Sequence, residues 1–333
     1  MNPKNNITFD TSAKLTQFLM KCIGLSLEAF TPELEKNGRS WWKISQGTLF
    51  FLSYLLLFLT ALGEAAYFRQ SLINYKGFLD VTAVAPCIGF CFLSLIKMLT
   101  VSFNSKTLSR MHTELRNMFP NDGENDIVVE SMKKSHKNML QFVIPNMIFM
   151  LCFNSIPLIM MSAQYFKGQE ITLSLPYLIW YPIDVYVMPL YIFIYAFQVW
   201  ASIVAIGGIL AADCPFSLYT AHVCMHFRLL AQKMRTLTSK SEHRLLDLED
   251  LRPCIEEHQK LIDGEIAWAA YDSPWTDASM KYKKSLQFII LRAQRQQTYT
   301  AMKFSTVSFE SFASVLKASF SYFTLLRTVF SKD

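Results

Sequence analysis

Apolar residues in this chain are collected into long runs that are separated by polar segments. A helix needs about 20 mostly apolar residues to cross the hydrocarbon core of a membrane, because that core is about 30 Å thick. Four runs reach this length: 44–63, 81–103, 139–161 and 185–212. A fifth run, 307–330, is long enough but contains charged residues. The pattern predicts an all-α protein, a polytopic membrane helical bundle with five spans.

Two of these runs have features that need a physical explanation. Lys97 is the one charged residue of the second run and lies near its end, where we expect its side chain to reach the lipid headgroups. The fourth run has 28 uncharged residues, more than one crossing requires. We therefore expect a tilted helix, or a helix that continues beyond the membrane.

Lysine and arginine are concentrated in alternate segments between the runs. Residues 1–43, 104–138 and 213–306 contain 6, 6 and 13 of them, whereas residues 68–80 and 162–184 contain 2 and 1. Basic segments stay on the cytoplasmic side of a membrane, so we expect a cytoplasmic N-terminus and an extracellular C-terminus. The first residues contain no apolar stretch, and we expect no cleavable signal peptide.

This orientation divides the chain into four parts. They are a cytoplasmic N-terminal segment (1–43), spans one to four (44–212), a cytoplasmic helical region (213–306), and the last span with the extracellular C-terminus (307–333).

Composition narrows the class of protein further. Of the 333 residues, 52% are hydrophobic and 17% are charged, whereas about 25% are charged in an ordinary soluble domain. Seven cysteines are too sparse for a disulfide scaffold, and none lies in the two segments that we expect outside the cell. The net charge of +6 follows from the basic cytoplasmic segments, so no nucleic-acid partner is needed to explain it.

Helical periodicity continues after the fourth run. Apolar residues recur every three or four positions from Leu218 to Leu237, which predicts a long helix that enters the cytoplasm. A second basic, amphipathic stretch runs from Asp277 to Arg295. It can lie on the membrane surface or pack in an interface between subunits, and its aromatic neighbours favour the interface.

Catalytic and metal-binding patterns are weak. His222 and His226 have the i, i+4 spacing with which two imidazoles can share a metal ion, but a solvated or packed pair is the simpler interpretation. The chain contains no G-x-S-x-G, P-loop or C-x-x-C motif. We expect no enzyme activity, no catalytic residues, no cofactor and no metal.

The last run carries a single polar stripe. A 4-3-4-3-4 spacing places six polar side chains on one face of a helix, with phenylalanine and leucine opposite. The six are Glu310, Ser314, Lys317, Ser321, Thr324 and Thr328. A lysine that faces lipid near mid-membrane costs about 2.5–3.5 kcal/mol, so the stripe indicates either an aqueous path or a tight seam between helices. A pore built this way needs several copies around an axis.

Four segments, in this order, resemble insect odorant receptors. They are SLYTAHVCMHFRLLAQKMRTL (217–237), AWAAYDSPW (267–275), KKSLQFIILRAQR (283–295) and AMKFSTVSFESFASVLKASFSYFTLLRTV (301–329). The resemblance extends over nearly the whole chain and is weak before residue 200. It implies a receptor of seven spans in the plasma membrane of sensory neurons. It also implies that this odorant-binding subunit forms a hetero-tetramer with a co-receptor, and that the tetramer is a ligand-gated cation channel.

The resemblance also implies roles for individual residues. The last helix of each subunit lines the pore, and Leu325 and Val329 match the gate region. A small volatile odorant binds in a mostly apolar pocket in the outer half of the helical bundle, between spans two, three, four and six. Aromatic and methionine side chains at that depth are the candidate ligand contacts, although such residues are also common in ordinary cores. They are Phe90, Phe153, Met160, Tyr186, Met188, Tyr191 and Tyr195. We expect no charged group there, which disfavours a strongly ionic ligand.

The chain departs from the family in its number of spans, which is five rather than seven. Residues 257–262 resemble the approach to the fifth span, residues 267–275 resemble the segment after the sixth, and only 263–266 lie between them. We therefore expect spans five and six to be absent near 262–266. Losing two helices exposes the packing faces of their partners, so the bundle should be less stable.

Three alternatives stay open. The chain can be a truncated, non-conducting subunit that binds full-length partners through its cytoplasmic helices, a gustatory receptor, or a membrane transporter. A transporter would contain inverted repeats or a cluster of buried ionisable residues, and the sequence has neither pattern.

Overall fold

The computed structural model describes residues 8–25, 39–73, 78–120, 125–239, 279–293, 300–301 and 305–330. The chain divides into two compact units, Met1–His222 and Val223–Asp333. The segments 262–266 and 267–275, on which several of the expectations above depend, lie outside the described residues.

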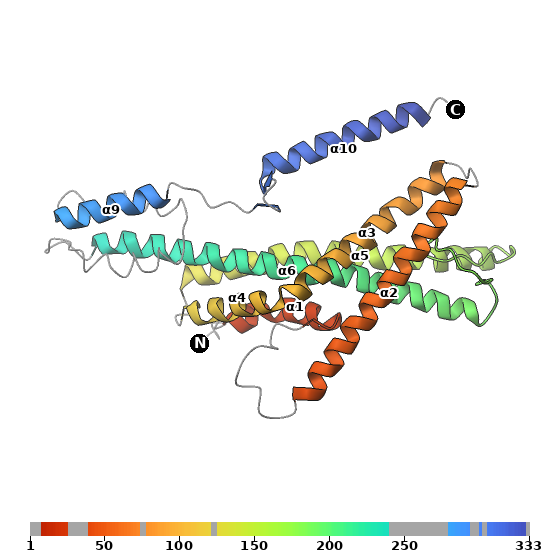
Figure 1. Ribbon diagram of the computed structural model, residues 1–333, viewed down its shortest axis with the longest axis horizontal. Helices are drawn as coiled ribbons and strands as arrows, with labels where there is room; N and C mark the ends of the chain where they lie inside the picture. Colours follow the sequence, from red (N-terminus) through yellow and green to blue (C-terminus); the bar gives the residue numbers. More distant parts are fainter. Residues whose placement is uncertain are drawn as a thin grey trace. The chain divides into compact units, whose positions relative to one another are not determined.

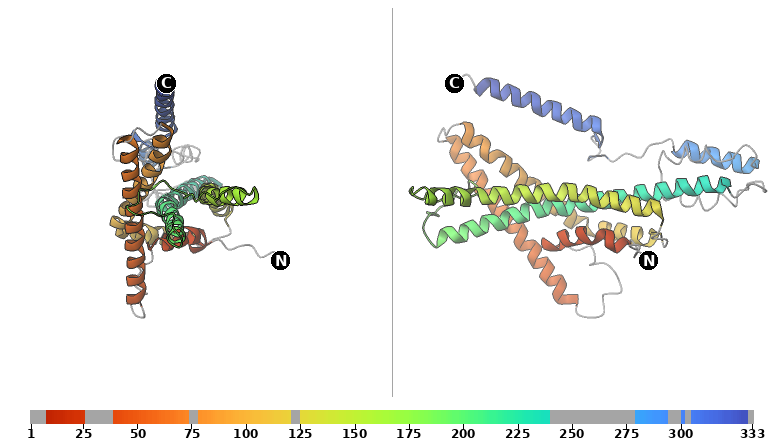
Figure 2. Two further views of the ribbon diagram at one scale, coloured as in Figure 1. Left: turned by 90° about the vertical axis from the view of Figure 1, so that its right-hand side faces the viewer. Right: turned by 180° about the vertical axis from the view of Figure 1, so that it is seen from behind.

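The first unit is a bundle of helices (Figure 1). Its elements are α1 (Phe9–Cys22), α2 (Arg39–Ile73), α3 (Phe78–Phe103), α4 (Ser105–Met118), α5 (Asp126–Phe166) and the first part of α6 (Leu190–Ser239). α5 and α6 run side by side, and the hairpin of α2 and α3 crosses them obliquely (Figure 2). This crossing brings four helices together.

The second unit contains the end of α6, followed by α9 (Met280–Ala293), β1 (Thr300–Ala301), β2 (Ser305–Thr306) and α10 (Phe309–Phe330). The two strands pair antiparallel, with Thr300 opposite Thr306. Among the described residues, this two-residue ladder is the only β-structure. The fold class is therefore all-α, as the sequence predicted.

Four described helices are long and apolar enough to cross a membrane: Ile44–Ile73, Val84–Phe103, Asp126–Phe166 and Leu190–Lys233. Each overlaps one of the first four runs that the sequence predicted, so those four spans are confirmed as helices. Large apolar side chains are exposed along them, for example Phe51, Phe92 and Phe149 at 64%, 61% and 64%. Such surfaces are unfavourable in water and suit lipid.

The fourth span begins later than predicted. The apolar run starts at residue 185, but α6 starts at Leu190, and residues 185–189 are not helical. Pro189 disfavours helical backbone at the preceding Met188, while proline itself is tolerated at the beginning of a helix. Tyr186 and Met188 therefore lie in the segment before α6 rather than on the span.

The expected long cytoplasmic helix is confirmed, because α6 continues without a break to Ser239 and is 50 residues long. The basic stretch that follows forms α9, which starts at Met280, three residues later than expected. The last run forms α10, a helix of 22 residues.

Lys97 has a partner in the bundle, whereas we expected its side chain to extend to the lipid headgroups. Its Nζ lies 2.7 Å from both carboxylate oxygens of Asp213 on α6, and the two side chains are 26% and 38% exposed. The sequence placed Asp213 just beyond the fourth run and did not connect the two charges. The pair joins α3 to α6, so Lys97 has a partner within the bundle.

Periodicity did not predict α1 and α4, which are short and pack beside α6. Phe9 of α1 lies between two histidine rings, with its centroid 4.9 Å from that of His112 and 4.8 Å from that of His222. His222 Nε2 is 3.0 Å from the Ser12 hydroxyl, and its side chain is fully buried. His222 is thus packed rather than solvated.

A glycine turn ends α1. Gly24 has φ +81°, its N–H donates to the carbonyl of Lys21, and the N–H of Leu25 donates to the carbonyl of Met20. These two bonds form a Schellman motif, which satisfies carbonyls that the end of a helix would leave unpaired. The turn brings the Gly24 backbone against α2 at Phe50.

Candidate ligand-binding site

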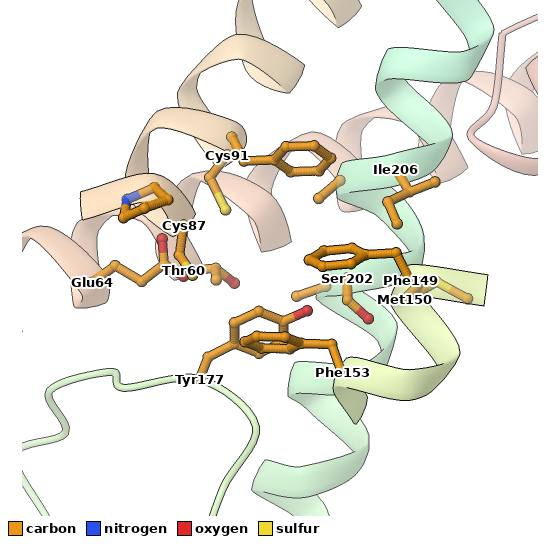
Figure 3. A pocket seen from close by; sticks show the side chains of 14 residues that line it. Thr60, Glu64, Cys87, Cys91, Phe149, Met150, Phe153, Tyr177, Ser202 and Ile206 are labelled. Carbon is orange, nitrogen blue, oxygen red and sulfur yellow. The ribbon is translucent and has the colours of Figure 1, made fainter. Parts of the chain in front are cut away.

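A mostly apolar, partly open cavity of about 150 Å³ lies where α2, α3, α5 and α6 meet (Figure 3). A cavity of this size can hold a molecule about as large as benzene. Fourteen residues line it: Thr60, Glu64, Pro86, Cys87, Phe90, Cys91, Phe149, Met150, Phe153, Tyr177, Ala201, Ser202, Ala205 and Ile206.

Aromatic rings form one wall of the cavity. The Phe149 and Phe153 centroids are 5.9 Å apart, and the Phe153 and Tyr177 centroids are 5.1 Å apart. Figure 3 shows Phe153 and Tyr177 lying together opposite Cys91. Rings at these separations form a rigid apolar surface against which a small organic molecule can pack.

The segment between α5 and α6 closes this end of the cavity by supplying Tyr177. The Gln198 side chain of α6 is fully buried; its Oε1 accepts from the Tyr177 N–H at 2.9 Å and its Nε2 donates to the Tyr177 carbonyl at 3.2 Å. The N–H of Trp180 donates to the Gly63 carbonyl of α2 at 3.1 Å. A Cβ at Gly63 would lie 2.4 Å from the Ile179 side chain, so glycine permits this close approach.

Replacing Gln198 with leucine should release this segment. The change removes both hydrogen bonds to Tyr177, and each such bond contributes about 1 kcal/mol. We expect the Tyr177 amide to exchange hydrogen at least about tenfold faster, measured by mass spectrometry on the purified protein. Gln141→Leu on the exposed face of α5 is the matched control. Unchanged exchange at Tyr177 in Gln198→Leu would show that Gln198 does not hold the segment.

The hydroxyl groups in the cavity wall differ in what they can offer a ligand. Thr60 donates to the Leu56 carbonyl at 3.0 Å, and Ser202 donates to the Val199 carbonyl at 2.7 Å, so both protons are already used. Burial raises the pKa of Tyr177, which lies outside the spans, to about 12. The Tyr177 hydroxyl therefore stays neutral at physiological pH.

Glu64 is the one acidic or basic residue among the fourteen that line this cavity, and we did not expect it there from the sequence. It follows directly after the first apolar run and resembles a residue at the end of a span. Its side chain is only 1% exposed. We expected no charged group in the pocket region, but Glu64 lines this cavity. The sequence also missed Tyr177, because it lies in a connecting segment.

The structure places the seven candidate ligand contacts in three situations. Phe90 and Phe153 line the cavity. Tyr191 and Tyr195 lie on α6 outside it, and their hydroxyls donate to the carbonyls of Ser174 at 2.8 Å and Asn154 at 2.5 Å. Met160, Tyr186 and Met188 are exposed, at 55%, 51% and 57%. A ligand role stays a prediction for all seven residues.

The eight candidate pore residues all lie on α10. Among the hydroxyls, Ser314, Thr324 and Thr328 donate to the carbonyls of Glu310, Ser321 and Thr324 at 2.9, 2.8 and 2.8 Å. The side chains of four further candidates are exposed in the single chain: Glu310, Lys317, Ser321 and Leu325. The Val329 side chain is not among those that the structure describes. Their pore role stays a prediction.

Metal binding finds no support in the residues that the structure describes. No group of three or more histidine, cysteine, aspartate or glutamate side chains among them could hold an ion. His222 and His226 are 0% and 3% exposed.

Comparisons with known proteins place this arrangement in a family. The family model described as "7tm Odorant receptor" matches residues 78–263 and 264–320. The chain belongs to the insect odorant receptor family. It is a multi-pass membrane protein and an odorant receptor by family, which confirms the resemblance in the sequence.

Relatives and solved structures agree with this assignment. The receptor is 24% identical to "Putative odorant receptor 92a" of Drosophila melanogaster, over 97% of this chain and 96% of that protein. It is 20% identical to odorant receptor 13a of the same species, over 96% and 97%. The structure of the olfactory receptor OR5 from Machilis hrabei is 16% identical, covers 95% and 97%, and has a TM-score of 0.69. The structure of that protein in complex with eugenol is 14% identical, has the same coverage, and has a TM-score of 0.73.

The alignments also reveal a difference in length. The alignment with odorant receptor 13a has 411 positions, whereas this receptor has 333 residues, so at least 78 positions lie opposite gaps. The match to the family model is divided between residues 263 and 264.

Proposed function

We propose that this receptor is the odorant-binding subunit of a ligand-gated cation channel, and that its ligand binds in the cavity between α2, α3, α5 and α6. The aromatic cavity carries the proposal, because it is large enough for a small volatile molecule and lies among four membrane-length helices. The complex of the Machilis receptor with eugenol supports a small organic ligand.

We assign the pore to α10. Its polar stripe and its apolar face, with Phe312 60% exposed, suit a helix that faces water on one side and protein or lipid on the other. One chain supplies one such helix, so the pore requires an oligomer, and we propose a tetramer with a co-receptor in the plasma membrane of sensory neurons.

The channel proposal is tested by co-expressing the receptor with its co-receptor and recording currents during odorant application. We expect a cation current that persists when G-protein signalling is blocked. Lys317→Gln should raise the relative permeability to calcium, because it removes a positive charge that repels cations in the pore. Phe312→Leu on the opposite face is the matched control.

The alternatives give different results in this experiment. Co-purification with the co-receptor without any current would support a non-conducting subunit.

The divided family match near 263–264 and the shorter length favour the absence of a two-helix segment, and its loss would weaken the bundle. Binding of tastants but not of volatile molecules would favour a gustatory receptor, and solute uptake without current would favour a transporter.

A further inference from the structure

The buried carboxyl group of Glu64 has no strong partner in the cavity. Neither carboxyl oxygen has a hydrogen-bond partner of acceptable geometry among the described residues. Thr60, one turn earlier on α2, donates to its own helix instead. The Cys91 thiol lies beside the carboxyl group, but thiols are weak donors. In Figure 3 the side chains of Glu64, Thr60 and Cys87 lie together on one side of the cavity.

The cavity wall provides no positive charge to balance this group. None of the fourteen lining residues is a lysine, arginine or histidine. A carboxyl group buried without a partner is costly, and a carboxylate buried without a cation is more so. The missing partner can therefore come from a ligand.

The other polar atoms favour a ligand with hydrogen-bond donors over one that only accepts. The hydroxyl protons of Thr60 and Ser202 are already donated to backbone carbonyls. The other donors of the wall are the Tyr177 hydroxyl, which interacts with Ser202, and the Cys87 and Cys91 thiols, which are weak donors. Glu64, by contrast, offers two oxygens that no described donor satisfies.

We propose that this cavity selects volatile amines and that Glu64 is the residue that binds the ammonium group. This proposal rests on the proposed function, because it places the ligand in the same cavity. An ammonium ion can pair with the carboxylate, or a neutral amine can take the proton of the carboxylic acid. Both routes give the same ion pair, and the occupied cavity then carries no net charge.

The size and the apolar wall define the rest of the ligand. A volume of about 150 Å³ suits an amine with a single ring or a short alkyl chain. The rings of Phe90, Phe149 and Phe153 can pack against the apolar part, and aromatic faces also attract a cation nearby. The selected class is thus a small primary or secondary amine with an apolar body.

The test compares three probes of one skeleton that are about as large as benzene: butylamine, butan-1-ol and pentane. Affinity is measured on the purified full chain from the ligand-dependent rise of the thermal unfolding midpoint, which needs no conduction. We expect the wild type to bind the amine at least tenfold more tightly than the alcohol. Glu64→Gln should weaken amine binding ten- to a hundredfold and change alcohol binding less than threefold, since the amide keeps the shape but not the charge.

Glu114→Gln on the exposed face of α4 is the matched control, because it makes the same chemical change away from the cavity. Equal loss of amine and alcohol binding in Glu64→Gln, or no loss of either, overturns the proposal. If the Glu64→Gln variant does not fold, the affinities of the wild type for the three probes decide. An alcohol that binds the wild type as tightly as the amine overturns the proposal.

The proposed function and this inference fail in different ways. If no small organic molecule binds the purified chain or evokes current, the proposed function fails. If neutral probes bind in the cavity and the amine has no advantage, only the role of Glu64 fails.

Discussion

Replacing Gly24 with alanine is expected to cause the largest loss of stability in this receptor. Gly24 has φ +81°, a conformation that costs a residue with a side chain about 1–2 kcal/mol. A Cβ there would lie 2.3 Å from the Phe50 nitrogen and 2.6 Å from the Gln46 carbonyl oxygen of α2. These are backbone atoms, which cannot rotate away, and such overpacking adds about 1–3 kcal/mol.

The measurement is the thermal unfolding midpoint of the purified protein together with its yield at the cell surface. Gly168→Ala is the matched control, because Gly168 also has positive φ, +65°, but a Cβ there would meet no atom within 4 Å. We expect a modest fall for Gly168→Ala and a much larger one for Gly24→Ala. Equal falls would mean that the contact with α2 contributes nothing.

Breaking the Lys97–Asp213 pair is expected to have the second largest effect. Lys97→Met leaves the Asp213 carboxylate on α6 without its partner at 2.7 Å. Surface pairs contribute about 0–1 kcal/mol, whereas breaking a buried pair costs about 3–5 kcal/mol. These side chains are 26% and 38% exposed, so the loss should lie between the two limits.

A double-mutant cycle isolates the interaction. Asp213→Leu alone should also lower the unfolding midpoint, because it leaves Lys97 unpaired. The double variant, Lys97→Met with Asp213→Leu, should recover most of the loss, since neither helix then carries a lone charge. Strictly additive losses would show that the two residues do not act as a pair.

The predicted ligand contacts illustrate what a single sequence can supply. Phe90 and Phe153 could be selected because both lie deep within apolar runs and aromatic side chains are common in small-molecule sites. Tyr186 was placed on a span because its run is apolar, whereas Pro189 delays the start of α6. Composition alone does not separate an apolar helix from an apolar connecting segment.

Glu64 and Tyr177 illustrate what the sequence could not supply. Glu64 follows an apolar run, where a charged residue commonly marks the membrane boundary, and only the packing of α2 against the neighbouring helices buries it. Tyr177 joins the cavity because Gln198, 21 residues further along the chain, binds its backbone. Neither relationship leaves a periodic signal in the sequence.

The sequence by itself determined the apolar runs, the continuous helix α6, the helical last run and the family, because length, hydropathy and 3.6-residue periodicity act between near neighbours in the chain. The tertiary structure decided which side chains meet. Lys97 and Asp213 are 116 residues apart, and each looks like an isolated charge until α3 packs on α6. Glu64 likewise becomes a candidate ligand-binding group only when four helices pack around the cavity, since burial and the lack of a strong partner depend on the whole bundle.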